Sequence, residues 1–196
     1  MQHRRTAAAI AAVAIAASAA ACSSSGSSST ATTGTETLHG AATGSSAATN
    51  LNSSSNTPLK FPSFTYSGPV NLTVEPFTLP GGNGPSGTNT LPGGLRVHHV
   101  STLPGSSNPN TPPPATWTLK GKNCYFTATF DKGNYTIVSG STGKFAGATG
   151  HGTYVVAASG WAPLTGKTCS FNSVGPVSSQ GASIAFTASG PLTVTG

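Results

Sequence analysis

Apolar and polar side chains alternate at every second position in two segments of this chain. In the first segment the apolar side chains are Phe64, Tyr66, Val70, Leu72 and Val74. In the second segment, near the C-terminus, they are Ile184, Phe186, Ala188, Leu192 and Val194. A period of two is typical of a strand with one buried face and one exposed face. The alternation therefore predicts a half-buried β-strand in each segment.

The same two segments share a sequence motif. Residues 64–70 and 186–192 differ only at their third and seventh positions, and both contain Gly-Pro. Because proline cannot donate a hydrogen bond to a strand ladder, Gly-Pro inside a strand indicates a bend or a bulge. We expect two equivalent corners of a barrel at these places, and a duplicated binding element is the alternative.

Turn sequences divide the rest of the chain. Thr-Leu-Pro-Gly occurs at residues 78–81, 90–93 and 102–105, and Pro-Gly suits the central positions of a type II turn. Each copy is therefore expected to end a strand. An exposed loop with polyproline character is predicted for residues 104–116. Residues 123–139 fit a hairpin whose turn lies at residues 131–134.

Composition favours an all-β chain. Only 6% of the 196 residues are charged, and 25 Gly, 15 Pro and long Ser/Thr runs leave little sequence that favours helix. We expect about eight or nine strands in an antiparallel barrel or a barrel-like sandwich. The carboxylate side chains are Glu36, Glu75 and Asp131. Three carboxylates leave few possible pairs for general acid/base catalysis. The sequence therefore favours a protein that is not an enzyme, and no cofactor is expected.

The first 21 residues have the layout of a secretory signal peptide. Arg4-Arg5 precede an apolar run over residues 7–21, which is shorter than a membrane span. The small residues directly before Cys22 resemble the bacterial lipobox, in which the cysteine thiol receives a diacylglyceryl group. The resemblance implies a lipid anchor on Cys22 at the extracytoplasmic face of the bacterial cell membrane. The alternative is an ordinary cleavage site after residue 21.

The domain boundary follows from the distribution of large apolar side chains. Every aromatic residue lies between Phe61 and Phe186. Residues 22–34 are rich in Ser and Thr and are expected to form a lipidated, disordered tether, because they cannot bury enough surface to offset the entropy of ordering. A single β domain is then expected over residues 35–196, with an edge strand at residues 35–40.

Cysteine counting indicates one disulfide. With Cys22 assigned to lipid, Cys124 and Cys169 remain as a pair in an oxidising compartment. Closing a loop of about 46 residues stabilises the fold by roughly 4 kcal/mol in the chain-entropy account. The alternative is a zinc site made by this pair with one or more of His98, His99 and His151. No short spacing between ligands supports the zinc site, so no metal is expected.

Residues 142–154 contain the pattern Thr-Gly-x-Phe-x-x-Ala-x-Gly. This segment resembles a hairpin of the dirigent proteins and the allene-oxide-cyclase-like β-barrels. The resemblance implies that Phe145 plugs the core of a barrel and that the glycines let strands approach; it carries over no catalytic residue. Together with the signal, the tether and the cysteine pair, the segment also resembles uncharacterised bacterial secreted lipoproteins, which brings no known activity.

His99 and His151 are the remaining candidates for chemistry. His99 shares a strand face with Leu95 and Val97, so an inward His99 beside His151 would form a tentative pocket with a base or a ligand. The alternative is that His99 is a hydrogen-bonded structural histidine near the rim of the barrel. No catalytic residue is assigned.

Loss of the signal peptide leaves seven basic and three acidic side chains. The remaining lysines suit an anionic envelope polymer or lipid headgroups, whereas the lack of a basic run argues against nucleic acid.

Two hypotheses for the function follow from these observations. The leading one is a non-enzymatic, lipid-anchored β domain that binds a component of the cell envelope. The alternative is a β-barrel that holds a small hydrophobic ligand, as a carrier or as a cyclase-like or isomerase-like enzyme.

Overall fold

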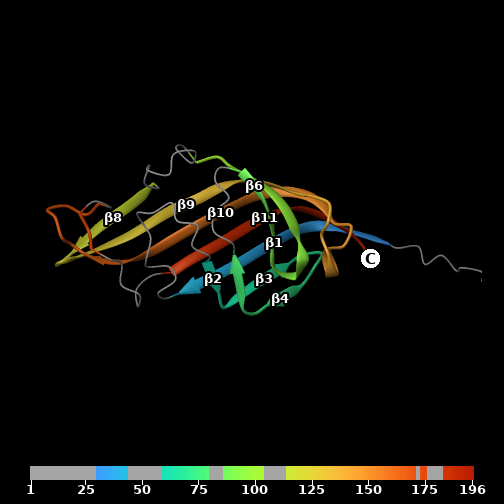
Figure 1. Cartoon of the computed structure of the whole chain (residues 1–196), viewed down its shortest axis with the longest axis horizontal. Helices are drawn as coiled ribbons and strands as arrows, with labels where there is room; N and C mark the ends of the chain where they lie inside the picture. The colour runs from blue at the N-terminus through green and yellow to red at the C-terminus, as the bar shows by residue number, and fades with distance from the viewer. Residues whose placement is uncertain (1–29, 44–58, 80–85, 104–113, 171–172, 176–182) are drawn as a thin grey trace, which may run out of the picture.

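The computed structural model describes residues 30–43, 59–79, 86–103, 114–170, 173–175 and 183–196 (Figure 1). Most of them lie in strands, which confirms the all-β prediction. The strands are β1 (Ala31–Thr43), β2 (Leu59–Phe61), β3 (Ser63–Ser67), β4 (Leu72–Val74), β5 (Phe77–Leu79), β6 (Ser86–Thr90), β7 (Arg96–Ser101), β8 (Ala115–Lys120), β9 (Asn123–Ile137), β10 (Thr149–Pro163) and β11 (Ser183–Thr195). Two 3-10 turns, η1 (Pro92–Gly94) and η2 (Gly143–Phe145), lie between strands. In the described part of the chain, no helix has the length and apolar character needed to cross a membrane.

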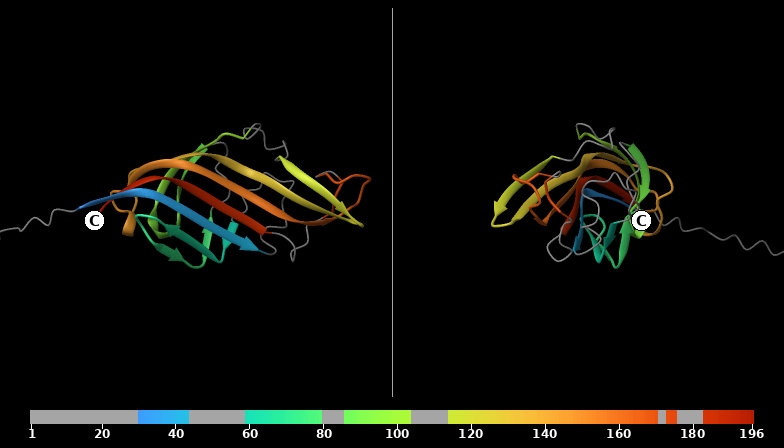
Figure 2. Two further views of the ribbon diagram at one scale, coloured as in Figure 1. Left: turned by 180° about the vertical axis from the view of Figure 1, so that it is seen from behind. Right: turned by 60° about the vertical axis from the view of Figure 1, so that its left-hand side comes forward.

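Nine of the strands form one antiparallel sheet. Its order is β4-β3-β1-β11-β10-β9-β7-β6, and β8 pairs with the first half of β9. The sheet is rolled into a half-barrel, as the right-hand view in Figure 2 shows. The pair formed by β2 and β5 is separate. The expected barrel-like fold of about eight or nine strands is therefore confirmed.

The inner face of the half-barrel carries the core. Alternate side chains of β1, β9, β10 and β11 are buried, as a period of two requires. Phe61 of β2 packs onto this face, since a Cβ placed on Gly40 would lie 3.3 Å from its ring. The largest fully buried side chains are Tyr66, Phe61, Phe64, Phe126, Phe145, Leu38 and Leu95. Phe145 thus occupies the core position that the hairpin resemblance implied for it.

One end of the half-barrel is closed by turns. The Tyr66 hydroxyl of β3 donates to the carbonyl of Pro92 in η1, and the N–H of Thr142 donates to the carbonyl of Gly94 at 2.9 Å. Gly93 has φ +74° and ψ 2° after Pro92, which is the type II geometry predicted from Pro-Gly. Strands β5, β6 and β7 end at Leu79, Thr90 and Ser101, within one residue of the three Thr-Leu-Pro-Gly copies, as predicted.

The prediction of a single strand over the first alternating segment is wrong. Residues 64–74 form a hairpin in which β3 and β4 pair, with Phe64 opposite Val74. Gly68 lies in the turn with φ +151°, a conformation that glycine adopts without strain. Gly190, the equivalent residue of the second segment, stays inside β11 opposite Glu36. The two Gly-Pro copies are therefore not equivalent corners.

The hairpin predicted for residues 123–139 is also wrong. This segment is the single 15-residue strand β9, which pairs with β10 along nearly its whole length. The register shifts between Val156 and Ala157, so one extra residue of β9 is accommodated as a bulge. Gly133 does not turn the chain. Its missing side chain lets β7 approach, because a Cβ there would lie 2.0 Å from the carbonyl oxygen of Val100.

The N-terminal boundary of the domain needs a further correction. Strand β1 begins at Ala31, so residues 31–34 belong to the sheet and not to the predicted tether. The strand expected at residues 35–40 is present, but β1 lies between β3 and β11 and is not an edge strand. The predicted signal peptide, residues 1–21, lies outside the described residues, and so do residues 104–113 of the proline-rich loop.

Candidate functional site

The cysteine pairing predicted from the sequence is present. The sulfurs of Cys124 and Cys169 are 2.16 Å apart and their Cα atoms are 5.6 Å apart. Because both thiols are consumed in this disulfide, they cannot serve as the zinc ligands of the alternative interpretation. Cys22, the predicted lipidation site, lies outside the described residues.

The structure does not bring His99 and His151 together. His99 of β7 is buried on the inner face, where its ring centroid lies 5.9 Å from that of Tyr154 and its Nδ1 is 3.4 Å from the Asn89 amide nitrogen. His151 is exposed on β10, next to Gly152, on the opposite face of the sheet. A pocket that uses both histidines is therefore not formed.

Near His99, polar groups on the inner face satisfy one another. The Tyr154 hydroxyl donates to Asp131 Oδ2 at 2.8 Å, and the Ser101 hydroxyl donates to Asp131 Oδ1 at 2.6 Å. Burial raises the pKa of Tyr154, and the hydrogen bond to Asp131 raises it further. This network ties β7, β9 and β10 together and leaves both carboxylate oxygens of Asp131 engaged.

Glu36 is the buried carboxyl of the inner face, with 1% of its surface exposed. Its Oε2 accepts a 3.0 Å hydrogen bond from the N–H of Val70, and its Oε1 has no partner among the described residues. Burial raises the pKa of Glu36, an effect that the hydrogen bond from Val70 partly opposes. Burial raises the pKa values of Tyr66 and Tyr135, and the charge of nearby Glu36 raises them further.

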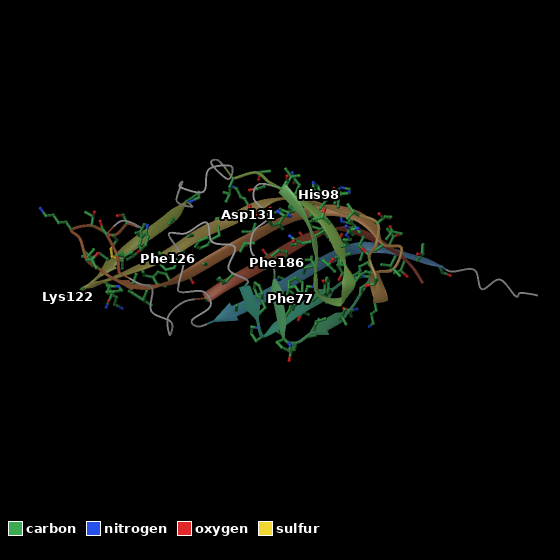
Figure 3. The ribbon with its side chains drawn as sticks, viewed as in Figure 1. Phe77, His98, Lys122, Phe126, Asp131 and Phe186 are labelled. Atoms are coloured by element: carbon green, nitrogen blue, oxygen red, sulfur yellow. A yellow bond between two sulfur atoms is a disulfide. The ribbon has the colours of Figure 1, made fainter. Side chains whose placement is uncertain are left out.

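Aromatic side chains fill much of the inner face around these groups. The ring of Phe64 lies 5.3 Å from Tyr66, 5.7 Å from Phe77 and 5.4 Å from Phe186. Tyr66 in turn lies 4.8 Å from Phe145. Figure 3 shows Phe77 and Phe186 on this side of the sheet. The cluster is a packed core of the kind that stabilises a domain.

On the outer face, the candidate binding features lie where the sheet projects beyond β11. Here β8, residues 123–128 of β9 and residues 160–163 of β10 form a three-stranded extension, because β10 pairs with β11 no further than Ser159. The extension carries the β8–β9 turn at its tip, near Lys122 (Figure 3). Its inner face holds Phe126 and the disulfide of Cys124.

An open trough of about 460 Å³ crosses the outer face at the base of the extension. Cross-strand partners line it in two rows. One row is Thr116, Thr127, Ser159 and Ser183; the other is Thr129, Ala157 and Ala185. The Ser159 and Ser183 hydroxyls are 2.9 Å apart and hydrogen-bonded. The trough therefore offers hydroxyl groups between small apolar side chains.

An aromatic pair adjoins the trough on the same face. Tyr125 lies directly opposite Trp161, with ring centroids 4.9 Å apart and planes tilted by 52°. Both side chains are half-buried. Because Phe126 and Ala162 face the core, Tyr125 and Trp161 face outward. Measured along the strands, the pair lies two residues, or about 7 Å, from Thr127 and Ser159.

Two lysines lie on the same extension as this pair. Lys120 lies on the outer face of β8, as does Thr118 two residues before it, and Lys122 lies at the tip. Both lysine side chains are exposed. The three carboxylate side chains lie elsewhere: Glu36 and Asp131 face inward, and Glu75 follows β4 at the opposite edge of the sheet. We define the outer-face site as Tyr125, Trp161, Lys120, Lys122 and the trough.

Comparison of the chain with known protein families, with characterised proteins and with solved structures found no match in any of the three. The resemblances to lipoproteins and to the dirigent-like hairpin therefore stay predictions.

Sequence reasoning missed the outer-face site and the burial of Glu36. The signal for Tyr125 was present, because the buried positions Cys124, Phe126 and Ala128 leave residue 125 on the other face. No local signal identified Glu36. Its burial depends on strands that are distant in sequence, and the sequence placed β1 at an edge, where a glutamate is exposed.

Proposed function

We propose that this protein is a lipid-anchored, extracytoplasmic binding module of a bacterial cell membrane. In this proposal Cys22 carries the lipid, and the β domain binds a component of the cell envelope without catalysing a reaction. The outer-face site is the surface that meets this component.

The observation that carries the proposal is the position of the extension relative to the start of the domain. Ala31, the first residue of β1, pairs with Thr195 beside the C-terminus. The tip of the extension at Lys122 lies at the other end of the molecule (Figures 1 and 3). A chain anchored ahead of Ala31 would therefore hold the extension away from the membrane.

The length of the connection also supports an anchored arrangement. Ala31 follows Cys22 by nine positions, and such a segment reaches at most about 30 Å. A domain on so short a connection stays close to the bilayer at its β1 end. The extension is then the part that is free to meet wall or envelope polymers.

The packing of the inner face favours a binding module over the alternative of a barrel that carries a small hydrophobic ligand. Ring contacts join Phe64, Phe77, Phe186, Tyr66 and Phe145 across the inner face. Side chains thus occupy the space that a lipid-like ligand would need. The outer face, in contrast, presents a trough and an aromatic pair to solvent.

Lipidation is tested by expressing the full chain and the variant Cys22→Ser in a bacterial host. We expect the wild type in the membrane fraction, with the added mass of a diacylglyceryl group on Cys22, and the variant in the soluble fraction. Wild-type protein that is cleaved after Ala21 and carries no acyl mass contradicts the proposal.

A further inference from the structure

We propose that the outer-face site binds an anionic polysaccharide, with sugar rings stacked on Tyr125 and Trp161 and acidic groups facing Lys120 and Lys122. This inference rests on the proposed function, since it specifies the component that the anchored domain binds. It assigns a chemical class of ligand to a surface built from β8, β9 and β10.

The aromatic pair is the first reason. The face of an aromatic ring carries partial negative charge, to which the C–H groups of a sugar ring bind favourably, and Tyr125 and Trp161 are each partly exposed. Tyr125 and Trp161 are not part of the core, because Phe126 and the disulfide occupy the inner face at this position. Their mutual tilt of 52° places two ring faces at an angle to each other, so a bent chain of sugars can contact both.

The trough supplies the hydrogen bonds that a sugar chain requires. From Tyr125 to Thr129 the site runs for about 13 Å along β9, enough for a few sugar rings. The hydroxyls of Thr116, Thr127 and Ser159 line this path. Each hydroxyl both donates and accepts, which suits the hydroxyl groups of a polysaccharide.

Charge selects an acidic polymer over a neutral one. Lys120 lies on the outer face of β8, in the strand row beyond Tyr125, and Lys122 lies at the tip. No carboxylate of the chain lies on the extension. An anion that approaches this end therefore meets attractive charge with no competing internal ion pair.

The test uses polygalacturonate as probe, and it compares two controls that each lack one feature. Dextran has sugar rings without charge, and poly-glutamate has carboxylates without sugar rings. We expect the folded chain to bind polygalacturonate more tightly than either control. We expect Tyr125→Ala/Trp161→Ala to weaken binding roughly tenfold, the loss of two stacking contacts.

Matched lysine variants separate the site from overall charge. Lys120→Gln/Lys122→Gln should weaken polygalacturonate binding and reduce its salt dependence. Lys132→Gln/Lys144→Gln removes the same charge outside the extension and should leave binding unchanged. Circular dichroism confirms that each variant is folded.

Several results would overturn the inference. Equal binding of dextran shows that charge does not select the ligand, and equal binding of poly-glutamate shows that stacking does not. If the two double lysine variants lose the same amount of binding affinity, binding does not depend on the lysines of the extension in particular. If the wild type is lipidated but binds no polygalacturonate, the ligand class is wrong while the anchored module stands; if it is not lipidated, the proposed function itself fails.

Discussion

The N–H of Val70 donates a 3.0 Å hydrogen bond to Oε2 of Glu36, and this contact joins the turn after β3 to the middle of β1. Glu36 itself lies opposite Gly190 of β11. A carboxyl group thus sits between three segments of the sheet with one oxygen bonded and the other without a partner among the described residues. Such an arrangement favours the neutral form of the carboxyl group, because an ionised form loses its hydration on burial.

We predict that Glu36→Gln stabilises the protein at neutral pH. Burial places the folded pKa of Glu36 above the ordinary value of 4.5. At pH values between 4.5 and the raised pKa of the folded state, the folded chain binds more protons than the unfolded chain. The free energy of unfolding therefore falls as the pH rises through this window. Each unit of elevation corresponds to about 1.4 kcal/mol at higher pH. Glutamine keeps the acceptor for Val70 and removes this loss.

Urea denaturation at a series of pH values checks this prediction. The wild type and Glu36→Gln should have similar stability at about pH 4, where the carboxyl is largely protonated in both states. They should diverge as the pH rises, with the variant the more stable. A variant that is less stable than the wild type at neutral pH would show that the ionised carboxylate stabilises the fold.

A second prediction concerns alkaline pH. Burial, together with the charge of Glu36, raises the pKa of Tyr135 to about 12 from its ordinary 10.0. The unfolded chain loses this proton first, so stability should fall as the pH rises from 10 to 12, by about 2–3 kcal/mol from this residue. Tyr135→Phe should show a shallower fall than the wild type. Tyr66 and Tyr154 also have raised pKa values, so part of the fall remains.

Alternation along the chain predicts the all-β fold because it reports directly which face of a strand is buried. The same signal gives no information about where a strand ends. Phe64 and Val74 keep the period of two across the Gly68 turn, so the hairpin has the sequence pattern of one strand. Gly133 misleads in the opposite sense, because a glycine that admits a neighbouring strand looks the same in sequence as one that turns the chain.

The candidate site is less predictable than the fold. Cys124 and Cys169 can be paired by counting, which needs no geometry. Tyr125 and Trp161 meet only because β9 and β10 pair in one register, and that register is set by contacts along the full strands. A sequence alone does not contain the register, so a surface made from side chains of three strands stays hidden until the strands are aligned.

Removal of the disulfide should destabilise the domain and weaken the outer-face site. Cys124 and Cys169 are separated by 45 residues, and loss of a cross-link of this length costs about 4 kcal/mol in the chain-entropy account. Beyond Ser159 the extension lacks the support of β11. Guanidinium denaturation of Cys124→Ala/Cys169→Ala measures the loss, and reduced wild-type protein should behave alike. Unchanged stability in both samples would mean that the inner-face packing of Phe126 suffices.

The close approach of β7 to β9 at Gly133 gives a last prediction. A Cβ at this position would lie 2.0 Å from the Val100 carbonyl oxygen and 2.9 Å from Ser101 Cα, which are backbone atoms that side-chain motion cannot relieve. Gly133→Ala should therefore separate β7 from β9 and cost about 1–3 kcal/mol or more. Thermal unfolding of the variant measures this cost.

The control for Gly133 is Gly121, in the β8–β9 turn. Gly121 has φ +63°, and a Cβ added there would have no atom within 4 Å, so Gly121→Asn should change stability by about 0.5 kcal/mol or less, since asparagine tolerates this conformation. Weakened contact between β7 and β9 should also loosen the Ser101–Asp131 hydrogen bond, which spans the same two strands. Hydrogen exchange of the β7 amides should therefore accelerate in Gly133→Ala and not in Gly121→Asn; equal exchange in both variants would show that the two strands can move apart without loss of pairing.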